Sequence, residues 1–176
     1  MHEKINAMNE KEQIKALKIS GFDIEYIDNP TEQMQLIAVK QFVWAIRKIE
    51  NPSEEVQLIA VRKDAETITV IKNPTELVKL EAVKKTGCIL EFIDNPSTQI
   101  QVEALKSDGN SIRYIQNPTL EMKMLAVTQA GSSIRFITTG VNEEIIIKAI
   151  RQDPYAIKYI SNPTQEMKKT SVEKSG

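Results

Sequence analysis

The feature that most constrains the fold is an Asn-Pro dipeptide that recurs every 22 residues. It begins at Asn29, Asn51, Asn73, Asn95 and Asn117, and occurs once more at Asn162. When each Asn is taken as position 1 of a repeat, the columns align without gaps as far as residue 138. A fixed period of this length indicates a repeat protein, in which small helical or strand units stack on their neighbours.

Apolar residues occupy the same positions in each copy. Position 6 is Met34, Val56, Val78, Ile100 and Met122, and position 10 is Ala38, Ala60, Ala82, Ala104 and Ala126. Positions 6, 8, 10 and 11 share one face of a helix, and positions 17, 18 and 21 share one face of a second, shorter helix. We therefore expect each repeat to hold a long helix of about three turns and a short α or 3₁₀ helix.

The residues that flank the long helix predict its ends. Asn before Pro favours extended backbone, so we expect Asn to cap the helix and Pro to take its first position. Glu32, Glu54, Glu76 and Gln165 then fall at the third helical position and complete a capping-box pattern. Gly21, Gly87, Gly109 and Gly131 occupy position 15, where we expect left-handed backbone to end the helix.

One repeat cannot bury its own apolar face, so neighbouring repeats must stack. The sequence predicts an all-α fold, an α-solenoid of about seven repeats in one domain spanning residues 1–176. Repeats begin near residues 7, 29, 51, 73, 95, 117 and 140, and a polar cap helix covers 162–176. The repeat at 139–161 has one extra residue and "TTGVNEE" in place of Asn-Pro. Its three consecutive isoleucines, Ile145, Ile146 and Ile147, cannot all face one core, so we expect at least one either to be exposed for a partner or to cover a gap left by the altered repeat.

Composition limits the class of function. The 23 basic and 24 acidic residues give a net charge of −1, which argues against a general nucleic-acid binder. The single cysteine, Cys88, fits a reducing compartment, and no apolar run has the length of a membrane span or a signal segment. We expect a cytoplasmic protein that does not enter a membrane.

Residue patterns for catalysis are not found. The single histidine, His2, leaves no Ser-His or Cys-His pair, and Cys88 is interpreted as a packing or surface thiol. Acidic residues gather in the first turn of the long helix and basic residues in its last turn, where the helix dipole favours them. These edges are either solvated or form strips for a charged partner. We expect no enzyme activity, no metal and no cofactor, with an enzyme that uses carboxylates as the third alternative.

The aromatic residues are concentrated at two positions. Eight of the nine occupy position 16 or 20, and position 19 is Arg47, Arg113, Arg135 or Lys158 in four repeats. These columns predict a ladder of aromatic and cationic side chains that includes Trp44, Arg47, Arg113, Tyr114, Arg135, Phe136 and Lys158. Such a ladder suits an acidic peptide or stacked bases, whereas the alternative is aromatic packing between repeats.

Two segments, "GNSIRYI" and "GSSIRFI", suggest an anion site at the start of the short helix. The second segment would offer the hydroxyls of Ser132 and Ser133 and the guanidinium of Arg135, together with free backbone N–H groups. The alternative is a glycine that stops one helix and a Ser or Asn that caps the next.

The repeat words "NPSEEVQLIAVRK", "AVKKTGCILEFI" and "AVTQAGSSIRFI" resemble short helical repeats of phage and bacterial proteins that form a domain of unknown function. The pattern is Glu-Val-x-x-x-Ala-Val, then Gly, then an Ile or Leu pair, and it covers most of the chain, with Asn142 and Pro154 as the main departures. The alternation of long and short helices is also similar to leucine-rich-repeat variants. The resemblance implies the fold and transfers no catalytic motif.

These observations predict a non-catalytic binding protein. The expected partner is another protein, and the resemblance to phage repeats implies a module that inhibits a host or bacterial protein. The alternative is a protein that sequesters an anionic nucleotide at the predicted ladder. The oligomeric state and the concave face stay open.

Overall fold

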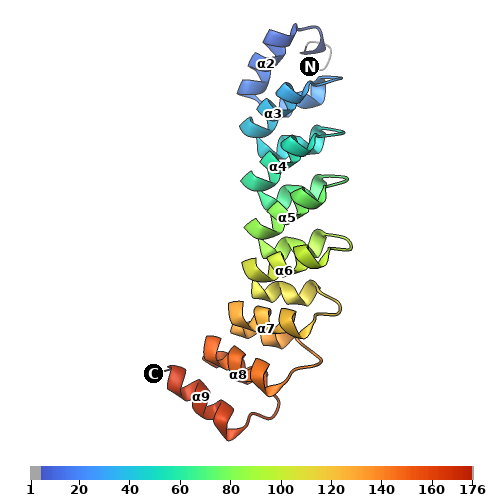
Figure 1. Ribbon diagram of the computed structural model, residues 1–176. Coiled ribbons are helices and arrows are strands. Elements are labelled where there is room, and N and C mark those ends of the chain that lie inside the picture. Colours follow the sequence, from blue (N-terminus) through green and yellow to red (C-terminus); the bar gives the residue numbers. More distant parts are fainter. Residues whose placement is uncertain (1–4, 176) are drawn as a thin grey trace. The chain divides into compact units, whose positions relative to one another are not determined.

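The computed structural model describes residues 5–175, and every regular element in that range is a helix. The long helices are α2 (Glu10–Ile19), α3 (Glu32–Gln41), α4 (Glu54–Lys63), α5 (Glu76–Lys85), α6 (Thr98–Ser107), α7 (Leu120–Gln129), α8 (Glu143–Gln152) and α9 (Gln165–Ser175). The short helices are all 3₁₀: η1 (Gly21–Tyr26), η2 (Val43–Lys48), η3 (Ala65–Val70), η4 (Gly87–Phe92), η5 (Gly109–Tyr114), η6 (Gly131–Phe136) and η7 (Pro154–Tyr159). The predicted α-solenoid of alternating long and short helices is confirmed (Figure 1).

The chain forms two compact units, with the boundary between Ala82 and Val83 inside α5. In unit 1, α2 packs on α3 and α3 on α4, while η1 packs on η2 and η2 on η3. In unit 2, helices α6 to α9 pack in sequence, as do η4 to η7. Each unit is therefore a layer of long helices beside a layer of short helices (Figure 1).

The core of each unit consists of the predicted apolar columns. Met34, Val56, Val78, Ile100 and Met122 are buried, as are the five alanines of position 10. From the short helices, Ile46, Ile68, Leu90, Ile112 and Ile134 at position 18 are buried as well. Position 8 is only half-buried, because it lies at the margin of the helix face that meets the core. This repeated burial leaves positions 16, 19 and 20 for the surface of the short helices.

The residue that caps the long helix differs from the sequence prediction. The Thr31 hydroxyl accepts a hydrogen bond from the Met34 amide at 3.4 Å, so Thr31 caps α3. Ser53, Thr75, Ser97, Thr119 and Thr164 occupy the same position and accept the equivalent bond. The predicted capping boxes at Glu32, Glu54, Glu76 and Gln165 are wrong, because these residues are the first of their helices. The Asn-Pro pair therefore belongs to the loop before the cap.

The role predicted for the position-15 glycines is also wrong. These glycines begin the short helices, and the only described glycine with positive φ is Gly140, at 61°. A Cβ on Gly109 would lie 2.2 Å from the carbonyl oxygen of Ala126 in the next repeat, and one on Gly21 would lie 2.4 Å from that of Ala38. Glycine is needed because the backbones of adjacent repeats touch at this position.

The altered repeat keeps the helical register by different means. Asn142 caps α8 by accepting a hydrogen bond from the Ile145 amide at 2.9 Å. Ile145 is fully buried, whereas Ile146 and Ile147 are half-buried. The three therefore do not share one core, as predicted, but none of them is exposed. The last helix, α9, is mostly polar and buries Met167 against its neighbours, as expected of a cap.

Candidate functional site

Six residues of the short helices form a continuous ladder in unit 2, here called the unit 2 ladder: Arg113, Tyr114, Arg135, Phe136, Lys158 and Tyr159. The Arg113 guanidinium lies 4.6 Å from the ring centre of Tyr114 and 5.6 Å from that of Phe136. The Arg135 guanidinium lies 4.6 Å from the ring of Phe136 and 5.9 Å from that of Tyr159. The Lys158 ammonium is 5.0 Å from the Tyr159 ring. For these residues, the predicted ladder is confirmed.

Local geometry explains why these residues align. A 3₁₀ helix has about three residues per turn, so positions 19 and 20 take the same orientation in each short helix. Because η5, η6 and η7 pack side by side, each arginine reaches the ring of its own repeat and the ring of the next. The cationic groups are exposed and the rings are half-buried. The contacts between neighbouring repeats are therefore made by the arginines, each of which lies over the ring of the next repeat.

Hydrogen bonds connect the ladder to an acidic residue at one end and to basic residues at the other. The Tyr114 hydroxyl donates to Glu91 Oε2 at 2.8 Å and accepts a hydrogen bond from the Arg113 guanidinium. Burial and the bond to Glu91 raise the pKa of Tyr114. A 3.4 Å hydrogen bond from Arg135 Nη1 lowers the pKa of the Tyr159 hydroxyl. The positive potential therefore grows from Glu91 towards the end of the ladder that holds Arg135 and Lys158.

Trp44 and Arg47 belong to unit 1 and are not part of the unit 2 ladder. Trp44 is half-buried and Arg47 is exposed, both on η2. The neighbouring Lys48 pairs with Glu25 at 2.5 Å. Phe42, outside the predicted aromatic columns, stacks on Phe22 with ring centres 4.4 Å apart. In unit 1, two repeats have no aromatic ring at position 20, where they carry Lys48 and Val70. The ladder of unit 2 is therefore not repeated there.

The structure does not support the predicted anion site at Ser132 and Ser133. Ser133 is 0% exposed, and so is Ser111 at the same position of the preceding repeat. Position 17 faces the core beside Ile134, so a ligand at the surface does not reach this hydroxyl. Ser132 is half-buried. The preceding short helix is capped by Asp108, which accepts a hydrogen bond from the Asn110 amide at 2.9 Å.

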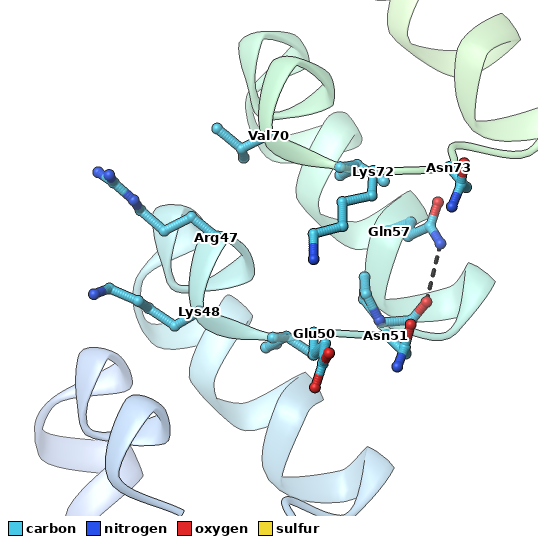
Figure 2. A pocket seen from close by; sticks show the side chains of 11 residues that line it. Arg47, Lys48, Glu50, Asn51, Gln57, Val70, Lys72 and Asn73 are labelled. Atoms are coloured by element: carbon cyan, nitrogen blue, oxygen red, sulfur yellow. Dashed lines mark hydrogen bonds between the residues drawn. The ribbon is translucent and has the colours of Figure 1, made fainter.

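A groove lies between consecutive loops of unit 1, with a volume of about 470 Å³. We call it the unit 1 groove. Its polar lining consists of Arg47, Lys48, Glu50, Asn51, Gln57, Lys72 and Asn73. Figure 2 shows the carboxamides of Asn51, Gln57 and Asn73 gathered on one side, with Lys72 extending into the space between the loops. Arg47 and Lys48 extend towards the opposite, outer side (Figure 2). The predicted residue Arg47 therefore borders a real concave feature.

The equivalent groove of unit 2 has a volume of about 590 Å³ and a different charge. We call it the unit 2 groove. Its polar lining includes Glu91, Asp94, Asn95, Gln101, Gln116 and Asn117. Tyr114 borders both this groove and the unit 2 ladder. Glu91 stands where unit 1 has Arg47 and Gln116 stands where it has Lys72, while Asp94 corresponds to Glu50, and the asparagines and the glutamine keep their positions.

The glutamine at position 7 is a site residue that sequence reasoning missed. Gln57 Nε2 donates to the Pro52 carbonyl oxygen at 2.9 Å, and Gln35 and Gln101 make the same bond at 3.1 Å to Pro30 and Pro96. Gln57 is 7% exposed, and its Oε1 has no hydrogen-bond partner among residues 5–175. The recurrence of Gln at this position beside Asn-Pro was the available signal.

The charged edges of the long helices are partly neutralised. Arg62 Nε pairs with Glu81 at 2.9 Å, and Lys106 pairs with Glu103 at 2.6 Å. The Lys63 ammonium donates to the Lys40 carbonyl oxygen at the end of the neighbouring helix α3. These contacts agree with the interpretation that the basic residues complement helix dipoles.

Two observations concern metal binding and the single cysteine. Within residues 5–175, no three His, Cys, Asp or Glu side chains come close enough to hold a metal ion. The Cys88 thiol donates to Asp108 Oδ2 at 3.1 Å, and this bond together with burial raises its pKa, so the thiol stays protonated at neutral pH. Among the described helices, none is both long and apolar enough to cross a membrane.

No protein-family model matches the chain, and neither a curated protein nor a solved structure shows significant similarity to it. The resemblance to phage and bacterial repeats stays a prediction.

Proposed function

We propose that this chain is a non-catalytic, cytoplasmic binding protein that recognises an acidic surface of a partner protein through the unit 2 ladder. The observation that carries the proposal is the order of the ladder, in which two guanidinium groups lie over three aromatic rings. An inhibitory role against a host or bacterial protein is part of the same proposal.

The ladder holds its cations in place before a partner arrives. A cation over an aromatic ring gains about 0.5–1 kcal/mol at an exposed site, which restricts the long arginine side chain. A partner therefore loses less side-chain entropy when it binds. Each exposed guanidinium presents a planar set of N–H donors that matches the two oxygens of a carboxylate. An acidic partner surface satisfies this array better than a neutral one.

The occupied ring faces favour a protein partner over a nucleotide. A base that stacks on Phe136 must displace Arg113 or Arg135, both of which lie within 6 Å of the ring centre. A carboxylate binds the same arginines without that displacement. A nucleotide thus remains the alternative outcome of the test rather than a second proposal.

The test is a pull-down from a bacterial lysate with the tagged chain, followed by proteomics and small-molecule mass spectrometry of the eluate. We expect a stoichiometric protein that is lost with the double variant Arg113→Ala/Arg135→Ala. The matched control is Lys84→Ala/Arg151→Ala, which removes two basic residues from the ends of long helices and should keep the partner. Retention of the partner by the ladder variant contradicts the proposal, and recovery of a nucleotide with raised absorbance at 260 nm supports sequestration instead.

A further inference from the structure

A further groove lies on the long helices of unit 2, where α7, α8 and α9 pack side by side (Figure 1). Its volume is about 580 Å³. Its apolar lining is Met124 of α7 and Ile147 of α8, both half-buried. Its polar lining is exposed and consists of Thr128, Glu143, Glu144, Lys148, Arg151 and Glu166. An apolar strip bordered by charged side chains is the usual composition of a protein–protein interface and its rim.

The charges of this groove are separated along α8. Glu143 and Glu144 lie in the first turn of α8, and Arg151 lies in its last turn. Glu166 is in the first turn of α9, so it belongs to the acidic end. Seven residues separate Glu144 from Arg151, which is about 10 Å along a helix, and Ile147 lies between them. The helix therefore presents an acidic end, an apolar middle and a basic end.

The charged side chains of the groove are not paired with one another. Arg62, in the last turn of α4, pairs with Glu81 at 2.9 Å, whereas Arg151, in the last turn of α8, forms no ion pair with any described residue. Glu144 and Lys148 are four residues apart on one helix, a spacing that allows a pair, yet neither has an ion-pair partner between residues 5 and 175. The groove thus keeps charges of both signs available to another molecule.

This arrangement is complementary to itself. A two-fold axis perpendicular to the groove, passing beside Ile147, brings α8 of two copies together in antiparallel orientation. The acidic first turn of each copy then faces the basic last turn of the other, so that every attractive contact forms twice. Met124 and Ile147 of both copies meet in the middle, and the antiparallel helix dipoles attract each other. A foreign partner would need the same order of charged and apolar groups, which a second copy has by symmetry.

We propose that α7, α8 and α9 form the interface of a symmetric homodimer, in which Glu144 of each copy pairs with Arg151 of the other across a shared apolar strip. Lys148, Glu143 and Glu166 lie at the border of this strip and complete the charged rim. The interface lies on the long helices, whereas the unit 2 ladder lies on the short helices, so this inference does not rest on the function proposed above.

The test measures the molecular mass of the whole chain by sedimentation over a series of protein concentrations, where we expect a monomer–dimer equilibrium. Glu144→Arg or Arg151→Glu should each weaken dimerisation at least about tenfold, because each reversal places two pairs of like charges in the interface. An equimolar mixture of the two variants should dimerise again, because the reversed charge of one copy then faces an opposite charge on the other. The matched control is Glu55→Arg, in the first turn of α4 and outside the groove, which should change dimerisation less than about twofold.

Several results would overturn the proposal. These are a monomer at every protein concentration up to about 1 mM, a dimer that both single variants leave unchanged, and a mixture of the two variants that stays monomeric. A dimer that is lost only with Arg113→Ala/Arg135→Ala would assign the second copy to the unit 2 ladder. A foreign protein that binds a monomeric chain and is released by both groove variants would take the place of the second copy. If a single variant unfolds at a lower temperature than the unchanged chain, Glu144→Arg/Arg151→Glu provides an independent test, because it restores both pairs and should dimerise.

Discussion

The unit 1 groove and the unit 2 groove have the same scaffold and opposite charge. Both place two asparagines and one glutamine at equivalent repeat positions. In both, the glutamine Nε2 donates a hydrogen bond to a proline carbonyl oxygen. Position 19 is Arg47 in one and Glu91 in the other, and the next repeat supplies Lys72 in one and Gln116 in the other. Repeat geometry therefore provides a constant set of amide groups, while the surface columns determine the charge of each groove.

The two units also differ in the residues at position 15, although Gly21 of unit 1 has the same close backbone contact as the glycines of unit 2. At position 15, unit 2 has Gly87, Gly109 and Gly131, whereas two repeats of unit 1 have Val43 and Ala65. A Cβ on Gly109 would lie 2.2 Å from a backbone oxygen, which no side-chain movement relieves. The spacing of repeats in unit 2 thus depends on glycine in a way that these repeats of unit 1 do not.

The largest expected effect follows from that difference. Gly109→Ala should lower the free energy of unfolding by about 3 kcal/mol or more, because backbone must move to admit the methyl group. Ala65→Gly, at the same position in unit 1, should cost only about 1 kcal/mol through backbone entropy and a lost methyl group. Urea unfolding of both variants measures the two values. A loss below about 1 kcal/mol for Gly109→Ala would show that adjacent repeats separate easily.

A charge reversal at position 19 should have the next largest effect and should distinguish the two units. We expect Arg135→Glu to weaken binding of the partner protein at least about tenfold, because a repulsive charge replaces an attractive one in the unit 2 ladder. Arg47→Glu, at the same position of unit 1, should change it less than about twofold, because Arg47 is not part of the ladder. Calorimetry with the purified partner measures both changes. Equal losses in the two variants would show that the ladder does not distinguish the units.

Salt should show how much of this binding is due to charge. Raising ionic strength from about 0.05 M to about 0.5 M screens exposed charges and should weaken binding of the partner protein at the unit 2 ladder a few-fold. Fluorescence anisotropy across the salt series measures the change. An affinity that stays the same in high salt would show that charge does not contribute to binding at the ladder.

The smallest effect concerns the tyrosines of the unit 2 ladder. The pKa of Tyr114 is raised by burial and by Glu91, and the pKa of Tyr159 is lowered by Arg135, so Tyr159 should ionise first as pH rises. Ultraviolet titration of Tyr114→Phe and Tyr159→Phe assigns the two transitions by difference. The Arg135→Ala variant should raise the pKa of Tyr159 and leave that of Tyr114 nearly unchanged. Ionisation of Tyr114 before Tyr159 would contradict the hydrogen bonds of the ladder.

Much of the fold follows from periodicity, because burial repeats with the period. The position-6, position-10 and position-18 columns predict the core, and the position-19 and position-20 columns predict the unit 2 ladder. The errors concern contacts that periodicity does not encode. Gly109 is needed at position 15 because the carbonyl oxygen of Ala126, 17 residues later, lies where a Cβ would be. Ser133 is fully buried, whereas its neighbour Ser132 is only half-buried.

The cap and the groove teach a related lesson. Thr31 and Asn29 are both good helix caps by residue type, and only the backbone path decides between them. Gln57 lies outside the apolar face of its helix, so its burial is due to the loop at Pro52, to which its side chain is hydrogen-bonded. Both features depend on the loop conformation, which the sequence pattern predicts less well than the helices.

The most direct test of the account is a magnetic-resonance titration of the isotope-labelled whole chain with the acidic segment of the partner protein. The account predicts shifts in the side-chain Nε–H signals of Arg113 and Arg135, and none in that of Arg47 or in the indole N–H signal of Trp44. Equal shifts in both sets, or shifts confined to the second set, would contradict the claim that the cations ordered over the rings of unit 2 decide where an acidic segment binds.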